Sequence, residues 1–279
     1  MAGFFNLWEY RRDYRELLAN PEQNSSAVKL YEEANALLDE LEKLPTYRVT
    51  AVFGIFPAER SGRNSVTIHT ENGDRVFNFL RSQAAGKGDN RCNPCLADFV
   101  DTADDAMGFF AVNAGADDLL KKYRSENDIY SGLLLQSLTD RLAEAGASYL
   151  HYLIRTEFWG YSRESSLAEE IVQEKAPGIR PAPGYPSCPD HHEKQLFWDI
   201  LHPDSAIGLR LTESFMTLPV SSVTAYVFGN SEAEYITVSG VCRDQLEDYG
   251  RRTGRSVADL EKSLASCLGY IPESLKLSD

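Results

Sequence analysis

The densest set of chemically capable side chains lies between Arg180 and Lys194, in the sequence RPAPGYPSCPDHHEK. Four of these fifteen residues are prolines, each of which fixes φ and lacks a backbone donor. We call this stretch the proline ribbon and expect it to be extended and rigid. Between the prolines stand a guanidinium, a phenol, a thiol and two imidazoles. This combination favours a role in holding a ligand over that of a plain surface loop.

Zinc binding is one chemistry that these residues could perform. Cys92-x-x-Cys95 and Cys188-x-x-His191 could together supply four ligands at a plausible spacing. Short cysteine and histidine matches also arise by chance, and no second CxxC pair is present. The alternative is two half-buried thiols and a turn bracketed by prolines. The odd count of five cysteines and the lack of a secretory signal favour free thiols in a reducing compartment.

Several other familiar sites are missing from the sequence. It contains no GxGxxG after a strand, no GxSxG elbow and no HExxH. Gly86-Lys87-Gly88 lacks the spacing of a phosphate-binding loop. There is also no Asp-x-His-x-x-Gly signature for binding cobalamin. Nucleotide, acyl-transfer and metalloprotease chemistry therefore find no support in the motifs.

Composition indicates one globular domain with a substantial core. The chain has 279 residues, of which 43% are hydrophobic and 25% charged. A net charge of −14 disfavours nucleic-acid binding, and the arginines of DYGRRTGRSVADLEKSL favour a short structural helical hairpin. No apolar run approaches the ~20 residues that span a bilayer, and the N-terminus becomes charged too early for a signal peptide. We expect a cytoplasmic protein without nucleic-acid or membrane partners.

Helices are expected where apolar residues recur at helical spacing behind a capping residue. The clearest spans Ser25–Leu44, with Tyr31, Ala34, Leu38 and Leu41 on one side. Further helices are expected over residues 127–155, 166–174 and 191–201, the last capped by Asp190, and from Arg243 and Ser256 onward.

Strands are expected where β-branched and aromatic residues gather between turn signals. The expected strands are YRVTAVFGIFP (47–57), SVTIHT, RVFNFL, AIGLRLTESF, SVTAYVFG and AEYITVSG. The Asn72-Gly73 pair predicts a hairpin turn between the second and third of these, because both residues tolerate positive φ. Neighbouring strands joined by hairpins differ from the regular βαβ alternation of a parallel sheet. We expect a single domain over residues 26–279, preceded by an N-terminal extension over residues 1–25.

A longer set of motifs resembles one known family. GIRPAPGYPSCPDHHEK, LTESF and RDQLEDYGRRTGRS, with CLADFV, LLLQSLTDRLAEA, EFWGY and LGYIPE, resemble the C-terminal activation domain of cobalamin-dependent methionine synthase, in the family's order. The resemblance runs from about Leu30 to Pro272. It implies an α+β fold, a single C-shaped domain with a twisted, mostly antiparallel β-sheet flanked by helices.

The resemblance also implies that the proline ribbon is one wall of a groove for S-adenosylmethionine. Arg180 would grip the carboxylate of the ligand with its forked guanidinium. The ribbon would leave carbonyls such as that of Ala182 free to accept from the adenine or the ammonium group. The other ligand-binding positions that the family pattern implies are Gly184, Tyr235 and Ile236, with carboxylates at Asp98, Glu144 and Glu174 to balance the positive groups.

Two ribbon residues, Tyr185 and His191, match positions that face the cobalamin in the family. On sequence alone the structural explanations are favoured: an aromatic plug on the prolines for Tyr185 and a first-turn helix residue for His191. The chain departs from the family pattern at Ile236 and Leu218, where a second aromatic and a tryptophan are usual. These departures affect the detailed shape of the groove.

The family's activity implies a repair function. The chain would bind S-adenosylmethionine and support reductive methylation of cob(II)alamin to methylcobalamin, reactivating a methionine synthase supplied in trans. Cobalamin would be carried by the partner, reduced by a flavodoxin-like electron donor, and this chain alone would not make methionine. Two alternatives remain: a docking module for another corrinoid methyltransferase, and a zinc-stabilised protein without catalysis.

Overall fold

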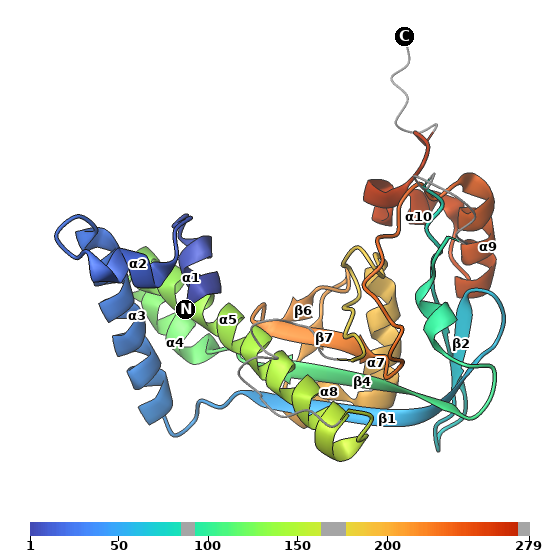
Figure 1. Ribbon diagram of the computed structural model, residues 1–279, viewed down its shortest axis with the longest axis horizontal. Coiled ribbons are helices and arrows are strands. Elements are labelled where there is room, and N and C mark those ends of the chain that lie inside the picture. The colour runs from blue at the N-terminus through green and yellow to red at the C-terminus, as the bar shows by residue number, and fades with distance from the viewer. Residues whose placement is uncertain (85–92, 163–176, 273–279) are drawn as a thin grey trace, which may run out of the picture.

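The computed structural model of the protein describes residues 1–84, 93–162 and 177–272. A curled antiparallel sheet occupies the middle of the molecule, and a group of helices rises at each end, giving an open, C-like outline (Figure 1). The expected α+β fold with a mostly antiparallel sheet is confirmed. Within the described residues, no helix is both long and apolar enough to cross a membrane.

The central sheet has five strands in the order β3-β2-β1-β4-β7, and every pair is antiparallel. A separate pair, β5 and β6, contains two residues in each strand. The strand bounds are β1 Thr50–Arg60, β2 Ser65–Ile68, β3 Arg75–Asn78, β4 Asp105–Asn113, β5 Arg210–Leu211, β6 Thr217–Leu218 and β7 Ser222–Val227.

Aromatic packing shows that the sheet curls into a half-barrel. Phe77 on β3 and Tyr226 on β7 lie at opposite edges of the strand order, yet their ring centroids are only 5.7 Å apart. Phe109 on the central β4 contacts both rings, at 4.8 Å and 5.8 Å. Phe197 from α7 (Lys194–Leu201) inserts among the three and is fully buried. The concave side is therefore filled by one aromatic cluster, and α7 is held inside the curl.

The other face of the sheet is covered by the long helix α5 (Ile129–Leu153). Phe110 and Val112 of β4 point to this face, whereas their neighbour Phe109 points to the concave side, as strand alternation requires. They pack with Ala147 and Leu150 of α5. α5 continues into a short π-helical turn, η2 (Ile154–Phe158). This packing fixes the second half of α5 against β4 and β7, which positions its polar residues beside the sheet.

The first half of α5 belongs to a separate helical core. α1 (Ala2–Leu7), α2 (Tyr14–Ala19), α3 (Ser25–Lys43) and α4 (Asp117–Ser125) pack around it. Phe4 and Phe5 are each 1% exposed in this core, beside Leu134 and Leu138 of α5. Residues 1–25, expected as an extension, therefore share a core with the helices that follow them.

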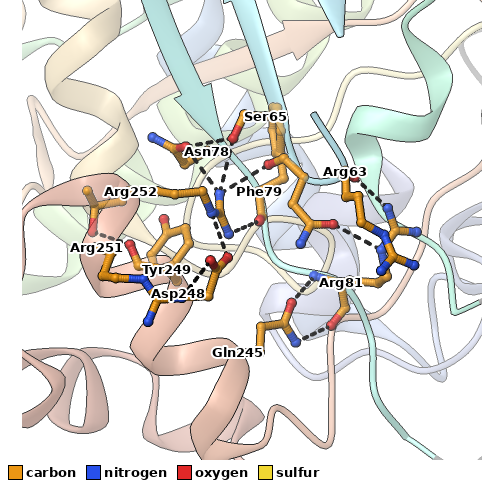
Figure 2. A network of polar contacts seen from close by, with 12 residues as sticks. Arg63, Ser65, Asn78, Phe79, Arg81, Gln245, Asp248, Tyr249, Arg251 and Arg252 are labelled. Carbon is orange, nitrogen blue, oxygen red and sulfur yellow. Dashed lines mark hydrogen bonds and ion pairs between the residues drawn. The ribbon is translucent and has the colours of Figure 1, made fainter. Parts of the chain in front are cut away.

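At the opposite end, α9 (Arg243–Thr253) is attached to the sheet through side-chain hydrogen bonds, and α10 (Val257–Ser263) packs against α9. Arg252 donates to Asn78, to Ser65 and to the carbonyl of Phe79, and its guanidinium pairs with Asp248 (Figure 2). Gln245 accepts from the backbone N–H of Arg81 at 2.7 Å and donates to its carbonyl at 2.9 Å. The end of the sheet is thus held by polar contacts as well as by the core.

A buried carboxylate links the proline ribbon to these C-terminal helices. Asp190 is 4% exposed and accepts from Tyr249 at 2.8 Å and from Arg255 at 2.6 Å. It also caps η3 (His191–Glu193), accepting from the backbone N–H of His192, as expected from the sequence. The cap therefore fixes both where the helix begins and where α9 and α10 are attached.

Several sequence-based expectations need correction. The first strand continues through Pro57 to Arg60, because β1 changes partner there: its ladder with β2 begins only at Ala58. The AEYITVSG segment forms no strand, and most of AIGLRLTESF lies outside β5, with α8 (Pro203–Ile207) overlapping its start. β4 and α4 were not expected. The helix expected over residues 166–174 lies outside the described residues.

Candidate functional site

The proline ribbon lies along the free edge of β7. Just before it, Ile179 exchanges backbone hydrogen bonds with Phe228 at 3.1 and 3.0 Å. Two residues later, the carbonyl of Pro181 accepts from the N–H of Tyr226 at 3.0 Å. Pro181 accepts a hydrogen bond from β7, but a proline cannot donate one in return. The ribbon therefore continues the sheet as a wall without becoming a regular strand.

A tight turn at residues 184–188 shapes the middle of the ribbon. Gly184 donates to the carbonyl of Cys188 at 2.8 Å, and Cys188 donates to that of Tyr185 at 2.9 Å. Gly184 has a φ of +97°, and a Cβ placed there would lie 2.0 Å from Cε1 of His191. Glycine is thus needed both for the left-handed backbone and for the close approach of the imidazole. The turn leaves Tyr185 62% exposed.

The segment from Tyr235 to Val238 lies against the ribbon and forms a second wall. Val238 donates its backbone N–H to the carbonyl of Pro186 at 2.8 Å. Ser187 Oγ donates to the carbonyl of Ile236 at 2.6 Å, and the backbone N–H of Arg180 donates to Tyr235 Oη at 3.1 Å. Three contacts of different kinds, rather than a ladder, therefore hold the two walls together.

A pocket of about 490 Å³ lies between these walls, and we call it the candidate pocket. β7 contributes Ser222, Val223 and Thr224, and α5 contributes Glu144. Lys194 and Thr217 complete the lining together with the two walls. Six residues expected at the site line the pocket: Glu144, Arg180, Ala182, Tyr185, Tyr235 and Ile236.

Comparison with known proteins identifies the family to which this architecture belongs. Residues 1–254 match the family described as vitamin B12 dependent methionine synthase, activation domain. The chain belongs to this family. A crystal structure of the MetH reactivation domain bound to AdoHcy is similar, with 38% sequence identity and a TM-score of 0.90. That similarity covers 97% of this chain and 86% of the other. The resemblance drawn from the motifs is therefore confirmed.

The activation domain carries opposite charges side by side at its candidate pocket. Arg180 Nη1 lies 3.7 Å from Glu144 Oε2, and Arg180 Nη2 donates to Ser148 Oγ at 3.1 Å. Glu144 and Ser148 are one helical turn apart on α5, so both reach the same guanidinium. A guanidinium can hold a carboxylate through two parallel hydrogen bonds, and a carboxylate can hold an ammonium group. The pair can therefore recognise a group that carries both charges.

His191 lies next to the candidate pocket and does not line it. Its ring packs on Gly184, and its Nδ1 is 3.0 Å from Nζ of Lys194. Burial, followed by the charge of Lys194, lowers the pKa of His191 below its ordinary value. Burial also lowers the pKa of Lys194, to about 8. The activation domain thus places an imidazole with a weakened proton affinity against Gly184, the residue before the exposed Tyr185.

Asp98, one of the expected carboxylates, does not line the candidate pocket. Asp98 accepts from Arg81 at 2.8 Å and from the backbone N–H of Cys95 at 3.0 Å, and Arg60 lies 3.7 Å away. In this arrangement Asp98 caps the short helix η1 (Leu96–Phe99) of the activation domain. Glu174 lies outside the described residues. Whether either carboxylate contacts a ligand stays a prediction.

The carbonyl of Ala182, expected to be free for a ligand, is already used within the ribbon. It accepts from the backbone N–H of Tyr185 at 3.1 Å and from Cys188 Sγ at 3.0 Å.

The two residues that depart from the family pattern, Ile236 and Leu218, both have a structural place in this chain. Ile236 is 5% exposed and belongs to the main core, and Leu218 pairs with Arg210 between β5 and β6.

The residues proposed for zinc are not gathered in the described part of the chain. No group of three or more histidine, cysteine or acidic side chains in the described ranges could hold a metal ion. Cys188 is buried, donates to Ala182 and has a pKa well above the ordinary value because of that burial. Cys95 is buried in the core, and Cys92 lies outside the described residues.

Sequence reasoning missed several lining or supporting residues of this activation domain. Ser148 could have been found from its position one turn after Glu144 on the same helix. Lys194 stands in the quoted ribbon, yet a lysine at the start of a helix is usually solvated. Thr217 and Thr224 carry no local signal of a binding site, because threonine is common in strands.

Proposed function

We propose that the candidate pocket binds S-adenosylmethionine and that the chain presents the ligand's methyl group to cobalamin held by a partner protein. The proposal rests on the pairing of Arg180 with Glu144 beside an apolar proline wall. The similar MetH reactivation domain is bound to AdoHcy. S-adenosylhomocysteine is what remains of S-adenosylmethionine after its methyl group has left, so the two ligands share nearly all of their contacts.

The candidate pocket fits the proposed ligand in size and in chemistry. Its volume of about 490 Å³ lies within the ~300–1,000 Å³ that is typical of small-molecule sites. The amino-acid end of the ligand is a zwitterion, which Arg180 and Glu144 can match charge by charge. Apolar surface for the adenosine portion of the ligand comes from Pro181, Pro183 and Pro186.

We propose one role for each of these residues. Arg180 holds the carboxylate of the ligand, and Glu144 the ammonium group. Tyr235 is 55% exposed at the edge of the candidate pocket and packs on the ligand, while Gly184 and Ala182 shape the ribbon behind it. We retain Asp98 and Glu174 as further carboxylates that balance the ligand's positive charge.

The chemistry of the proposed function needs no nucleophile from this chain. When both are bound, S-adenosylmethionine supplies an electrophilic methyl group and the partner's reduced cobalamin supplies the attacking cobalt. The residues of this chain orient the sulfonium, which is a proximity effect rather than acid–base catalysis. Tyr185 and His191 face the partner's cobalamin. The partner is the cobalamin-binding module of a methionine synthase or a related corrinoid protein, reduced by a flavodoxin-like donor.

Arg180→Ala should weaken S-adenosylmethionine binding by roughly ten- to a hundred-fold, because a lost charge-assisted contact costs about 1.5–3 kcal/mol. Isothermal titration calorimetry at fixed pH and salt measures this. Arg124→Ala, which removes an exposed arginine from α4, is the matched control and should leave the affinity unchanged. Equal affinity in Arg180→Ala and the unaltered chain contradicts the residue assignment. Asp98→Asn in the same titration tests the role of that carboxylate.

Added in trans to a methionine synthase core without its own activation domain, the chain should restore methylcobalamin formation. The assay contains S-adenosylmethionine and an electron donor, and the cobalamin absorption spectrum reports the product. Tyr185→Phe and His191→Ala should slow methylation more than they weaken ligand binding. The expected slowing is about five-fold for each hydrogen bond of ~1 kcal/mol that is lost. If the chain binds the ligand but methylates only another corrinoid protein, the partner assignment is wrong.

A further inference from the structure

Lys194 is a buried ammonium group without a carboxylate partner in the described part of the chain. It is 6% exposed, although lysine is almost never buried to this extent unless it is paired. Its Nζ donates to the carbonyl of Phe215 at 3.2 Å and lies 3.0 Å from Nδ1 of His191. The neighbouring Glu193 accepts instead from the backbone N–H of Asn78. The charge of Lys194 is therefore held by one carbonyl and one imidazole nitrogen.

The contact with His191 constrains the proton on that imidazole. An ammonium group carries only donors, so the nitrogen that faces it must act as an acceptor. A neutral imidazole has one acceptor nitrogen and one N–H group. With Nδ1 as the acceptor, the proton lies on Nε2, and a second proton on Nδ1 would point at the lysine.

The other charged groups around His191 leave this assignment in place. Asp190 is next in sequence, yet its carboxylate accepts from Arg255, Tyr249 and His192. The adjacent turn places Gly184 against the ring and contributes no charge there. Lys194, from α7, is the group that hydrogen-bonds to the ring. Burial and then the charge of Lys194 lower the pKa of His191, the charge of Asp190 raises it, and the charge of His192 lowers it.

We propose that Lys194 is a positioning residue that fixes His191 in the neutral tautomer protonated on Nε2, so that a hydrogen-bond donor is presented beside the candidate pocket. Lys194 also lines that pocket, so the same side chain contacts both the pocket and the imidazole that carries the Nε2–H donor. The tautomer itself follows from the contacts above. Its use in recognising an acceptor oxygen on the partner or its cobalamin rests on the proposed function.

The tautomer can be measured directly by ¹H–¹⁵N correlation spectra of the imidazole rings in ¹⁵N-labelled full-length protein at pH 7. The chain has five histidines, and the spectrum of His191→Gln identifies the signals of His191. The unaltered chain should show an unprotonated Nδ1 and a protonated Nε2 for that ring. A proton on Nδ1 in the unaltered chain overturns the proposal without any variant at Lys194.

Lys194→Met keeps the length of the side chain and removes the donor. The spectrum of His191 should then move toward a mixture of tautomers, and its pKa should rise toward the ordinary value. His192, whose Nδ1 lies 3.2 Å from Asp190 Oδ1, is the internal control and should keep its signals. An unchanged His191 tautomer in a folded Lys194→Met protein contradicts the proposed role.

The methylation assay separates this inference from the proposed function. Lys194→Met should slow methylation, and combining it with His191→Ala should add less than two-fold, because the first change depopulates the Nε2–H donor that the second removes. Full additivity of the two variants contradicts a shared role. If the unaltered chain shows the predicted tautomer but supports no methylation, the proposed function fails while the assignment of Lys194 as the group that fixes the tautomer stands.

Discussion

Gly184→Ala should lower the free energy of unfolding by about 3 kcal/mol. An alanine at this position, where φ is +97°, costs ~1–2 kcal/mol in backbone strain. Its Cβ would also lie 2.0 Å from the ring of His191, and overpacking of this kind costs ~1–3 kcal/mol. Urea denaturation of Gly184→Ala and of the unaltered chain measures the sum of the strain and overpacking costs. The ribbon turn should tolerate no side chain larger than hydrogen at this residue.

Two variants separate the strain from the clash. Gly254 has a φ of +71° and nothing within 4 Å of the position of an added Cβ, so Gly254→Ala measures the backbone cost alone. His191→Ala removes the ring, and in that background Gly184→Ala should cost no more than Gly254→Ala. If Gly184→Ala costs no more than Gly254→Ala in the unaltered background, the imidazole does not restrict the turn.

Glu193→Gln should flatten the dependence of stability on pH between about pH 5 and 8. Glu193 is buried, and its carboxyl accepts from the backbone N–H of Asn78 at 3.3 Å. Burial, followed by the charge of Asp190, raises the pKa of Glu193 to about 8. The folded state therefore holds a proton that the unfolded chain releases near pH 4.3. Stability supplied by this group is full below that pH and is lost as the pH rises toward 8.

The loss in the unaltered chain can reach about 1.4 kcal/mol per pH unit, the limit for one proton. Glutamine keeps the shape of the protonated acid and cannot ionise, so the variant should become relatively more stable as the pH rises. Chemical denaturation at half-unit steps of pH measures the difference between variant and unaltered chain. Glu232→Gln, at an exposed position, serves as the control. Parallel pH curves for Glu193→Gln and the unaltered chain refute the raised pKa.

Elements with local signals were predictable from the sequence. The cap at Asp190, the hairpin turn at Gly73 and the long helix α5 all depend on neighbours within a few residues. β4 was missed because it is paired on both sides and buried on both faces, so its residues do not alternate. The AEYITVSG segment has strand-like composition, but the ribbon that it meets has prolines where a ladder needs donors.

The candidate pocket was predictable only where the chain carries its own signal. The ribbon was identified from its prolines and its arginine, and Glu144 was identified from the family motif. The contact between Lys194 and His191, the use of the Ala182 carbonyl by Cys188, and the capping role of Asp98 each join residues close in sequence, yet none of them was predicted. No residue type or spacing predicts these contacts, because each is decided by side-chain orientation after folding.

The way in which the sheet ends at each side bears on how readily a further strand can add to it. Beyond β7, a neighbouring chain would meet prolines, which cannot donate to an added strand. Just after β3, the side-chain amide of Gln245 occupies both the N–H and the C=O of Arg81, as a neighbouring strand would. The β7 margin is thereby poorly suited to strand addition, a common first step of aggregation, and at the other margin the backbone just beyond β3 is already paired.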